Sequence, residues 1–179
     1  MNNNILLLYK SHTGFTKKYA ELIASTVNCT LSDSKIASVK QLSDYDIILF
    51  GSRAYAGTID GYKTIQKLFE KSTASTLILF VTGATPATAK ETIQAFWNQN
   101  LSAKEQETIP HFYLPGGLCY EKMSTKDRWM MKIAATMIKK KKNKTASDRE
   151  FEQAIASSYD LSDPIYITEL VSFLQELCK

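Results

Sequence analysis

The chain has 179 residues, a formal net charge of +4, 44% hydrophobic residues and 22% charged residues. These values are typical of one soluble globular domain with a sizeable core. No apolar run reaches the roughly 18 residues of a membrane span, and the start Met1–Asn4 has no basic region, so we expect neither a transmembrane helix nor a signal peptide. Cys29, Cys119 and Cys178 form no C-x-x-C or metal-ligand spacing, which favours reduced thiols in a cytoplasmic protein without a metal site.

Continuous apolar runs alternate with segments of helical periodicity along the chain. In chain order we expect a strand at 5–9, a helix at 16–27, strands at 29–31 and 46–51, a helix at 61–72, a strand at 76–82, a helix at 87–98, a strand at 111–114, a helix at 124–142 and a last helix from 163 or 164. Because strands and helices alternate and the connections are short, we predict one α/β domain over residues 1–179, with a parallel sheet between two helical layers.

Residues 11–16, Ser-His-Thr-Gly-Phe-Thr, join the first strand to the first helix. The free N–H groups and the dipole at a helix N-terminus favour an anion, and Ser11, Thr13 and Thr16 add hydroxyl donors. The turn has neither the Gly-Lys-Ser/Thr sequence of a P-loop nor the three glycines of a dinucleotide fingerprint. A turn that holds phosphate with hydroxyls and amides, without Lys or metal, suits FMN.

Two further loops, 51–57 and 82–86, follow neighbouring strands and are expected at the same edge of the sheet. Tyr55 is placed to stack on a flavin ring, and Arg53 to reach the ribityl chain, the pyrimidine edge or an incoming acid. The alternative is that Tyr55 only fixes its loop and Arg53 is a surface charge. The predicted cofactor-binding residues are Ser11, His12, Thr13, Gly14, Phe15, Thr16, Ser52, Arg53, Ala54, Tyr55, Ala56, Gly57, Thr82, Gly83 and Ala84.

The turn at residues 11–16 resembles the FMN-phosphate signature of flavodoxins. Gly-Gly-Leu-Cys-Tyr at 116–120, Asp-Arg-Trp-Met-Met-Lys at 127–132 and the loop 52–57 resemble the flavodoxin-like protoporphyrinogen oxidases, also called menaquinone-dependent protoporphyrinogen IX dehydrogenases. The resemblance implies a three-layer, doubly wound parallel sheet of five strands in the order 2-1-3-4-5, with a basic helical insertion at about 121–150 after the last strand. It also implies a bound FMN that passes electron pairs from a reduced porphyrinogen to a quinone.

Two features depart from that family. Residues 82–92 contain Lys90 but no cluster of basic side chains, and Cys119 stands where a basic residue is expected. Both bear on the substrate, because the two carboxylates of a porphyrin require cationic partners. Neither bears on FMN.

Residues 121–150 hold ten Lys or Arg against four Asp or Glu, whereas the rest of the chain holds twelve against fourteen. The helix at 124–142 has two interpretations. Its apolar stripe packs on the core among solvated lysines, or its segment Lys126–Lys144 contacts an anionic membrane, with Trp129 and the methionines in the headgroup layer. Nucleic-acid binding is not favoured, because aromatic and basic residues do not interleave.

The leading hypothesis is an FMN-dependent oxidoreductase that acts on a porphyrinogen and a quinone at the inner face of the cell membrane. The alternative is a flavodoxin-type carrier of single electrons between protein partners, and a third is a flavodoxin-shaped module with a degraded site. The excess of positive charge favours an acidic partner. With two histidines and no acid pair at a telling spacing, we assign no catalytic residue.

Overall fold

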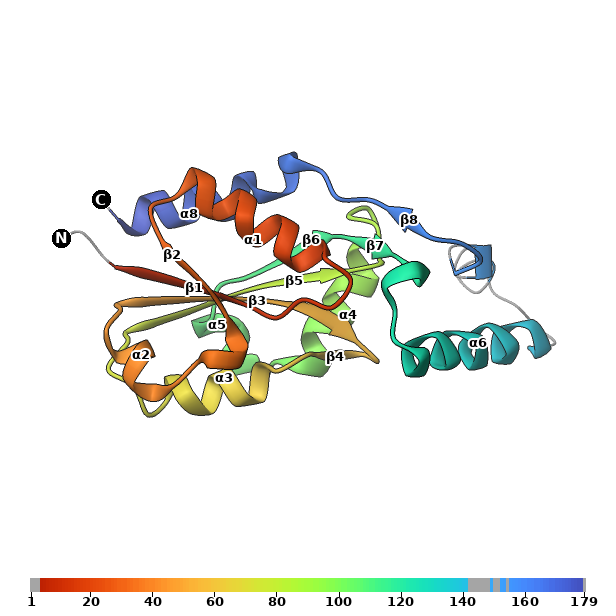
Figure 1. The fold of residues 1–179 in the computed structure, drawn as a ribbon, viewed down its shortest axis with the longest axis horizontal. Coiled ribbons are helices and arrows are strands. Elements are labelled where there is room, and N and C mark those ends of the chain that lie inside the picture. Colours follow the sequence, from red (N-terminus) through yellow and green to blue (C-terminus); the bar gives the residue numbers. More distant parts are fainter. Residues whose placement is uncertain (1–3, 142–148, 150–151, 154, 179) are drawn as a thin grey trace.

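A parallel sheet forms the centre of the protein in the computed structural model, which describes residues 4–141, 149, 152–153 and 155–178 (Figure 1). Its strands are β1 (Ile5–Tyr9), β2 (Thr30–Asp33), β3 (Ile47–Tyr55), β5 (Thr76–Gly83) and β6 (His111–Pro115). They lie in the order β2-β1-β3-β5-β6, and the short strand β4 (Thr58–Ile59) pairs antiparallel with β3. The predicted flavodoxin-like sheet is therefore confirmed, since these five parallel strands have the expected order 2-1-3-4-5.

Helices cover both faces of the sheet (Figure 1). The helices are α1 (Phe15–Thr26), α2 (Val39–Ser43), α3 (Tyr62–Phe69), α4 (Lys90–Asn100), α5 (Ala103–Thr108), α6 (Thr125–Lys140) and α8 (Thr168–Leu177), with 3-10 turns η1 (Ser34–Ile36), η2 (Tyr120–Lys122) and η3 (Pro164–Ile167). α1 and α8 pack on one face, and α2, α3 and α4 pack on the other.

The continuous apolar runs are explained by burial on both faces. Ile5 and Leu7 of β1 pack in the cluster under α1 and α8, whereas Leu6 and Leu8 pack in the cluster on the side of α3 and α4. None of the four is more than 2% exposed. Successive residues of a strand point to opposite faces, so a strand covered on both sides has no position for a polar residue.

One predicted boundary is wrong in a way that shapes the site. Strand β3 does not end at Gly51 but continues to Tyr55. Its extension pairs with β4, with Tyr55 opposite Thr58. The connecting residues Ala56 and Gly57 have φ angles of 48° and 79°, the left-handed values that a two-residue hairpin turn requires. Much of the predicted loop 51–57 is therefore a rigid hairpin.

A helical segment follows the last strand of the parallel sheet, as predicted. It lies between β7 (Gly117–Leu118) and β8 (Tyr159–Asp160), which pair antiparallel. Within it, Ser124 caps α6 by accepting the Asp127 N–H at 3.1 Å. α6 ends at Lys140 rather than at 142, and residues 142–144 of the predicted basic segment lie outside the described residues. Within the described ranges, none of the helices is long and apolar enough to cross a membrane.

Candidate functional site

A pocket of about 330 Å³ opens where β1, β3 and β5 end. The predicted residues that line it are His12, Thr13, Phe15, Thr16, Arg53, Ala54, Tyr55, Ala56, Thr82, Gly83 and Ala84. The structure thus brings the turn and both loops together, as expected for the carboxyl ends of parallel strands. Four predicted residues, Ser11, Gly14, Ser52 and Gly57, do not line this pocket.

The turn 11–16 has the free donors that a phosphate needs. The Ser11 Oγ is buried and has no hydrogen-bond partner among the described residues. Helix α1 begins at Phe15, directly after Gly14, which has a φ of 103°. In the described structure, no side chain caps the first N–H groups of α1. Buried polar groups are normally satisfied, and an uncapped helix start is a ready anion site. These residues therefore fit a phosphate group.

A pair of buried hydroxyls joins the turn to the neighbouring loop. The Thr16 and Thr82 Oγ atoms lie 2.8 Å apart, and Thr16 is 2% exposed. The Thr82 hydroxyl also lies 3.4 Å from the Ser52 carbonyl oxygen. Thr16 thus already has a protein partner, whereas the Ser11 and Thr13 hydroxyls have none among the described residues.

Tyr113 packs closely against Gly83, the last residue of β5, and so fixes the start of the loop that follows. A Cβ atom on Gly83 would lie 2.3 Å from the Tyr113 hydroxyl, so only glycine fits at this position. That hydroxyl accepts the Thr85 N–H at 3.0 Å, and burial raises the pKa of Tyr113, so the phenol stays neutral. The backbone of Gly83 and Ala84 is therefore presented to the pocket without a side chain in the way.

Ser52 and Gly57, two of the predicted residues, do not line the pocket and have structural roles in the β3–β4 hairpin. The Ser52 hydroxyl, which is fully buried, donates to the Asp60 carbonyl. Gly57 lies in the hairpin turn and is exposed. Ser52 therefore stabilises the hairpin, and Gly57 closes it.

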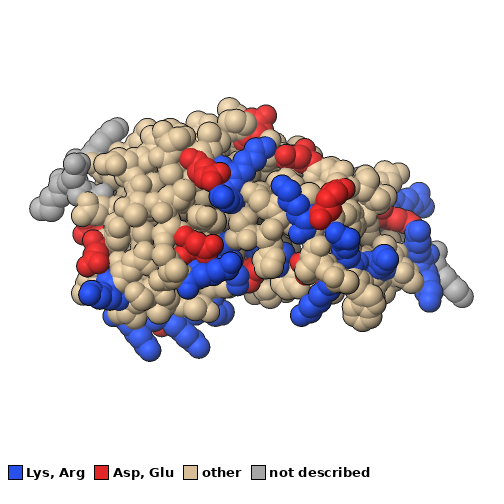
Figure 2. Space-filling model, viewed as in Figure 1, with Lys and Arg blue, Asp and Glu red and all other residues tan. Residues whose placement is uncertain are grey.

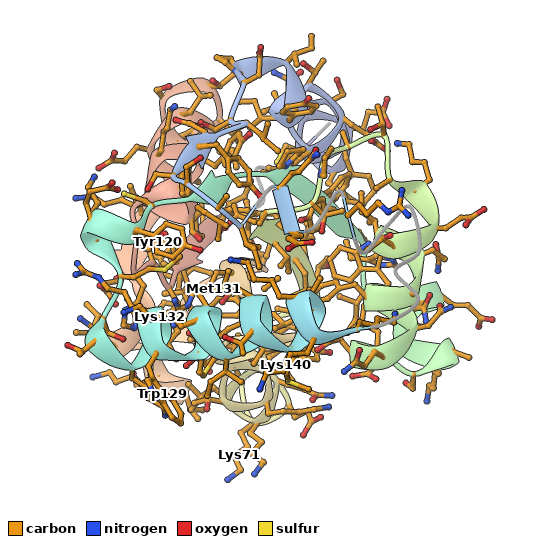
Figure 3. All side chains as sticks on the ribbon, turned by 90° about the vertical axis from the view of Figure 1, so that its right-hand side faces the viewer. Lys71, Tyr120, Trp129, Met131, Lys132 and Lys140 are labelled. Atoms are coloured by element: carbon orange, nitrogen blue, oxygen red, sulfur yellow. The ribbon has the colours of Figure 1, made fainter. Side chains whose placement is uncertain are left out.

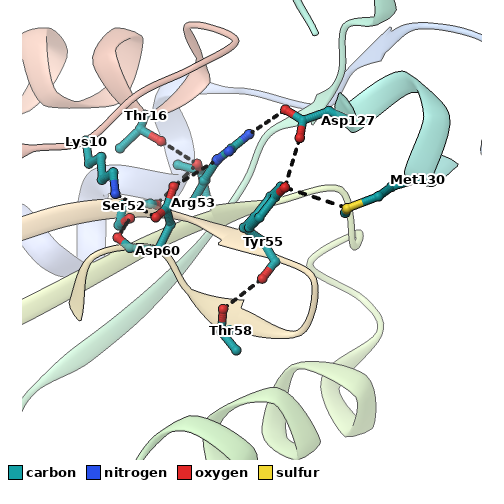
Figure 4. Close-up of polar contacts among 10 residues, drawn as sticks. Lys10, Thr16, Ser52, Arg53, Tyr55, Thr58, Asp60, Asp127 and Met130 are labelled. Carbon is teal, nitrogen blue, oxygen red and sulfur yellow. Dashed lines mark hydrogen bonds and ion pairs between the residues drawn. The ribbon is translucent and has the colours of Figure 1, made fainter. Parts of the chain in front are cut away.

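Charged groups on the hairpin form a network that reaches α6 (Figure 4). Arg53 contacts Asp60 through Nε at 3.2 Å and Asp127 through Nη1 at 3.5 Å. Its guanidinium carbon lies 4.2 Å from the centre of the Tyr55 ring, a cation–π distance. The Tyr55 hydroxyl donates to Asp127 at 3.0 Å. Arg53 and Tyr55 thus belong to one ordered unit.

The network keeps its carboxylates ionised. Burial alone would raise the pKa of Asp127, but the hydrogen bond from Tyr55 and the charge of Arg53 outweigh it and lower that pKa. The same competition lowers the pKa of Asp60, where Lys10 and Arg53 outweigh burial. The hydrogen bond to Asp127 raises the pKa of Tyr55. At neutral pH the site contains two carboxylates and a neutral phenol.

The remaining wall of the pocket was absent from the predicted site. Its residues are Gly116, Gly117, Leu118, Met123, Asp127, Met130 and Met131. A signal for the helical part was present, because 127, 130 and 131 share one face of a helix. The sequence does not indicate which face of this helix turns towards the turn 11–16 and the β3–β4 hairpin. Figure 3 shows Met131 on one side of α6 and Trp129 on the other.

Comparison with solved structures finds distant similarity. A WrbA-like flavodoxin protein from Agrobacterium tumefaciens is 20% identical, with 70% of this chain and 87% of that chain covered and a TM-score of 0.41. A flavoprotein in complex with FMN from Lactobacillus acidophilus is 20% identical, with 63% and 92% covered and a TM-score of 0.43. A Megasphaera elsdenii flavodoxin is 15% identical, with 68% and 89% covered and a TM-score of 0.45.

No curated protein matches the chain. The family model for the flavodoxin domain, in contrast, matches residues 6–145. That range covers the five parallel strands, β1 from its second residue, together with the turn 11–16, the hairpin and α6. The chain therefore belongs to the family of flavodoxin-domain proteins.

Proposed function

We propose that this protein is an FMN-dependent oxidoreductase of the protoporphyrinogen oxidase type. It would take electrons from a reduced substrate and pass them to a quinone-type acceptor. The observation that carries the proposal is the wall that α6 and the segment before it add to the pocket, because this wall gives the site a mainly apolar side next to the loops that would hold a flavin.

FMN is the cofactor that the flavodoxin-domain family and the site support. Ser11, Thr13 and the N–H groups at the start of α1 would hold its phosphate. The hairpin residues 53–56 and the glycine loop 82–84 would line its ring. When bound, FMN supplies the redox chemistry, and the chain binds it, orients it and limits the access of water.

The added wall is mainly apolar. Leu118, Met123, Met130 and Met131 line it, and Asp127 is its acidic group. Methionine side chains adapt to the shape of a flat ring and make favourable contacts with aromatic systems. A planar and largely apolar reactant, such as a reduced tetrapyrrole or a quinone ring, suits this wall.

Arg53 bears on how a carboxylate-bearing substrate would bind. Among the described residues of the pocket wall, it is the one with a permanent positive charge. Its guanidinium is shared between Asp60 and Asp127, so a substrate carboxylate would have to compete with both. We therefore infer that apolar ring contacts, rather than ion pairs, supply most of the substrate affinity.

The outer side of α6 supports the proposed contact with an anionic membrane. Trp129, Ile133 and Met137 follow one another at four-residue intervals and are 64%, 37% and 68% exposed. Lys132 and Lys140 border the same shallow groove, and Figure 2 shows Lys and Arg side chains gathered over this end of the molecule. Exposed apolar residues among lysines are typical of helices that lie on lipid, where a quinone would be available.

The test is oxidation of protoporphyrinogen by the FMN-loaded protein with a menaquinone analogue, without oxygen. Porphyrin fluorescence should appear at a rate proportional to the FMN-loaded fraction and should require the quinone. Protein stripped of FMN is the control. No porphyrin formation at full FMN loading would contradict the proposed activity.

Membership of the flavodoxin-domain family also favours the second candidate, a carrier of single electrons. A carrier would accept electrons in two separate one-electron stages during a reductive titration and would pass them to a protein partner. It would not turn over porphyrinogen. Failure of the porphyrin assay together with such two-stage reduction would favour the carrier.

A further inference from the structure

A second cavity, of about 450 Å³, adjoins the turn 11–16, the proposed phosphate turn. It shares Thr13, Phe15 and Leu118 with the first pocket, the proposed ring pocket. Thr13, Gly14 and Phe15 line it from the turn, and Leu118, Cys119, Lys122 and residues 158–160 line it from the segment after β6. Two lysines, Lys18 and Lys122, belong to its lining. This cavity therefore brings positive charge to a turn that has no lysine among its own six residues.

The two lysines differ in their partners. The Lys18 ammonium lies 2.6 Å from the Ser162 hydroxyl and 3.3 Å from the Asp160 carboxylate, so its charge is already paired. Lys122 has no acidic partner for its ammonium within the described part of the chain. Its Nζ lies 3.8 Å from the point that a Cβ on Gly14 would occupy.

The backbone that carries Lys122 is held in place. Arg128 of α6 donates from Nε to the Tyr120 carbonyl at 2.9 Å and from Nη2 to the Glu121 carbonyl at 3.2 Å. From the other side, the Tyr120 N–H donates to the Ser158 hydroxyl at 2.9 Å. Arg128 thus fixes the backbone of η2, and Lys122 at its end lines the cavity beside the phosphate turn.

We propose that Lys122 binds the phosphate dianion of the cofactor and makes the site select FMN over riboflavin. The proposal rests on the proposed binding of FMN. A dianion in the turn would lie between the start of α1 and an unpaired ammonium, and a charge-assisted hydrogen bond between such groups is among the stronger polar contacts. The segment after β6 would then contact the phosphate of FMN through Lys122 as well as line the pocket for the flavin ring.

The experiment compares two flavins and two substitutions. The Kd values of FMN and of riboflavin are measured by flavin fluorescence for the wild type, Lys122→Gln and Lys126→Gln, at low and high salt. Lys126, on α6, is exposed and loses the same charge without lining either cavity. Lys122 is also exposed, so its replacement leaves the fold intact.

We expect Lys122→Gln to raise the Kd of FMN about tenfold, to leave that of riboflavin within about twofold, and to weaken the salt dependence of FMN binding. Lys126→Gln should change neither Kd, and Lys122→Arg should restore most of the FMN affinity. An unchanged FMN affinity in Lys122→Gln, or an equal loss for both flavins, would overturn the role of Lys122. If the wild type bound neither flavin, the proposed cofactor itself would be wrong.

Discussion

The Ser11 hydroxyl is the group that most directly indicates a ligand. It is buried without a partner among the described residues, which costs the free protein roughly 1–3 kcal/mol. A phosphate oxygen would satisfy it. The free protein therefore carries the free-energy cost of the unpaired hydroxyl, and ligand binding would remove it.

Replacing Ser11 with Ala should move stability and affinity in opposite directions. We expect the free protein to become more stable by about 1 kcal/mol, because an unsatisfied hydroxyl is removed, and FMN binding to weaken by roughly 1.5–3 kcal/mol. Urea unfolding without flavin and a flavin titration measure the two effects. Thr13→Ala should reproduce the loss of affinity. A Ser11→Ala protein that binds FMN as the wild type does would refute the phosphate assignment.

Asp127 makes stability depend on pH. Its pKa is lowered below its ordinary value of 3.8, so its contribution is complete above that pH and is lost as the pH falls through the lowered pKa. Asp127→Asn should therefore be about 1–2 kcal/mol less stable than the wild type at pH 7, and the difference should shrink below pH 3.8.

Urea unfolding at pH 7 and at pH 3 checks the prediction for Asp127. Asp44→Asn, at an exposed aspartate after α2, is the control and should match the wild type at both values. A destabilisation of Asp127→Asn that is the same at both pH values would show that the carboxylate charge is not the cause.

The sequence predicts part of the site at this scale and misses part. Thr13, Tyr55 and Gly83 line the pocket because topology brings the ends of three strands to one edge of the sheet: Thr13 follows β1, and Tyr55 and Gly83 are the last residues of β3 and β5. Asp127 is missed, although the motif that contains it is visible, because the rotation of a helix about its axis is set by tertiary packing. Ser52 does not line the pocket, because its hydroxyl donates to the Asp60 carbonyl across a hairpin that no local sequence pattern predicts.

At the scale of elements, β3 shows why a glycine can mislead. Gly51 suggested a strand end, but the structure keeps it inside the strand. A Cβ atom there would lie 2.0 Å from the Phe80 ring of the neighbouring strand. The glycine is required by a side chain that packs across it, and no local pattern in the sequence distinguishes this role from that of a turn.

One side of α6 lines the pocket and the other is exposed. Replacing Lys132, Lys139 and Lys140 with Gln should weaken binding to phosphatidylglycerol vesicles by about 3 kcal/mol, since each lysine near an anionic surface contributes about 1 kcal/mol. FMN affinity should not change, because these three lysines do not line the ring pocket. Vesicle co-sedimentation at low and high salt measures the effect.

The matched control removes the same charge from another helix. Lys63, Lys67 and Lys71 are exposed on and just after α3, and Figure 1 shows α3 apart from α6 along the long axis of the molecule. Lys71 is labelled in Figure 3. Their replacement with Gln should leave vesicle binding unchanged. Equal losses in both triple variants would mean that net charge, rather than the face of α6, governs the contact.

The pairing of β7 with β8 allows residues 119–158 to be removed without cutting a strand. Leu118 and Tyr159 are register partners in the ribbon of β7 and β8, so an Asn-Gly turn can join them. We expect the shortened protein to unfold cooperatively, because none of the residues described for the two core clusters lies in the deleted range. We also expect it to lose porphyrinogen oxidation and to bind FMN about tenfold or more weakly.

Thermal unfolding, flavin titration and the porphyrin assay check this prediction. The shortened protein lacks the methionines of the pocket wall, Asp127 and Lys122. If it still oxidised porphyrinogen at the rate of the full chain, the wall formed by α6 would have no part in substrate binding.

The β7–β8 ribbon has a mechanical consequence. Both ends of residues 119–158 leave the body of the protein side by side, next to the phosphate turn, whereas α6 meets the β3–β4 hairpin through Asp127 and Met130. Swinging the helix outward would break those side-chain contacts and would not unpair any strand of the central sheet. A broad, flat molecule would then reach the site from the side of α6, while the β3–β4 hairpin and the central sheet keep their positions.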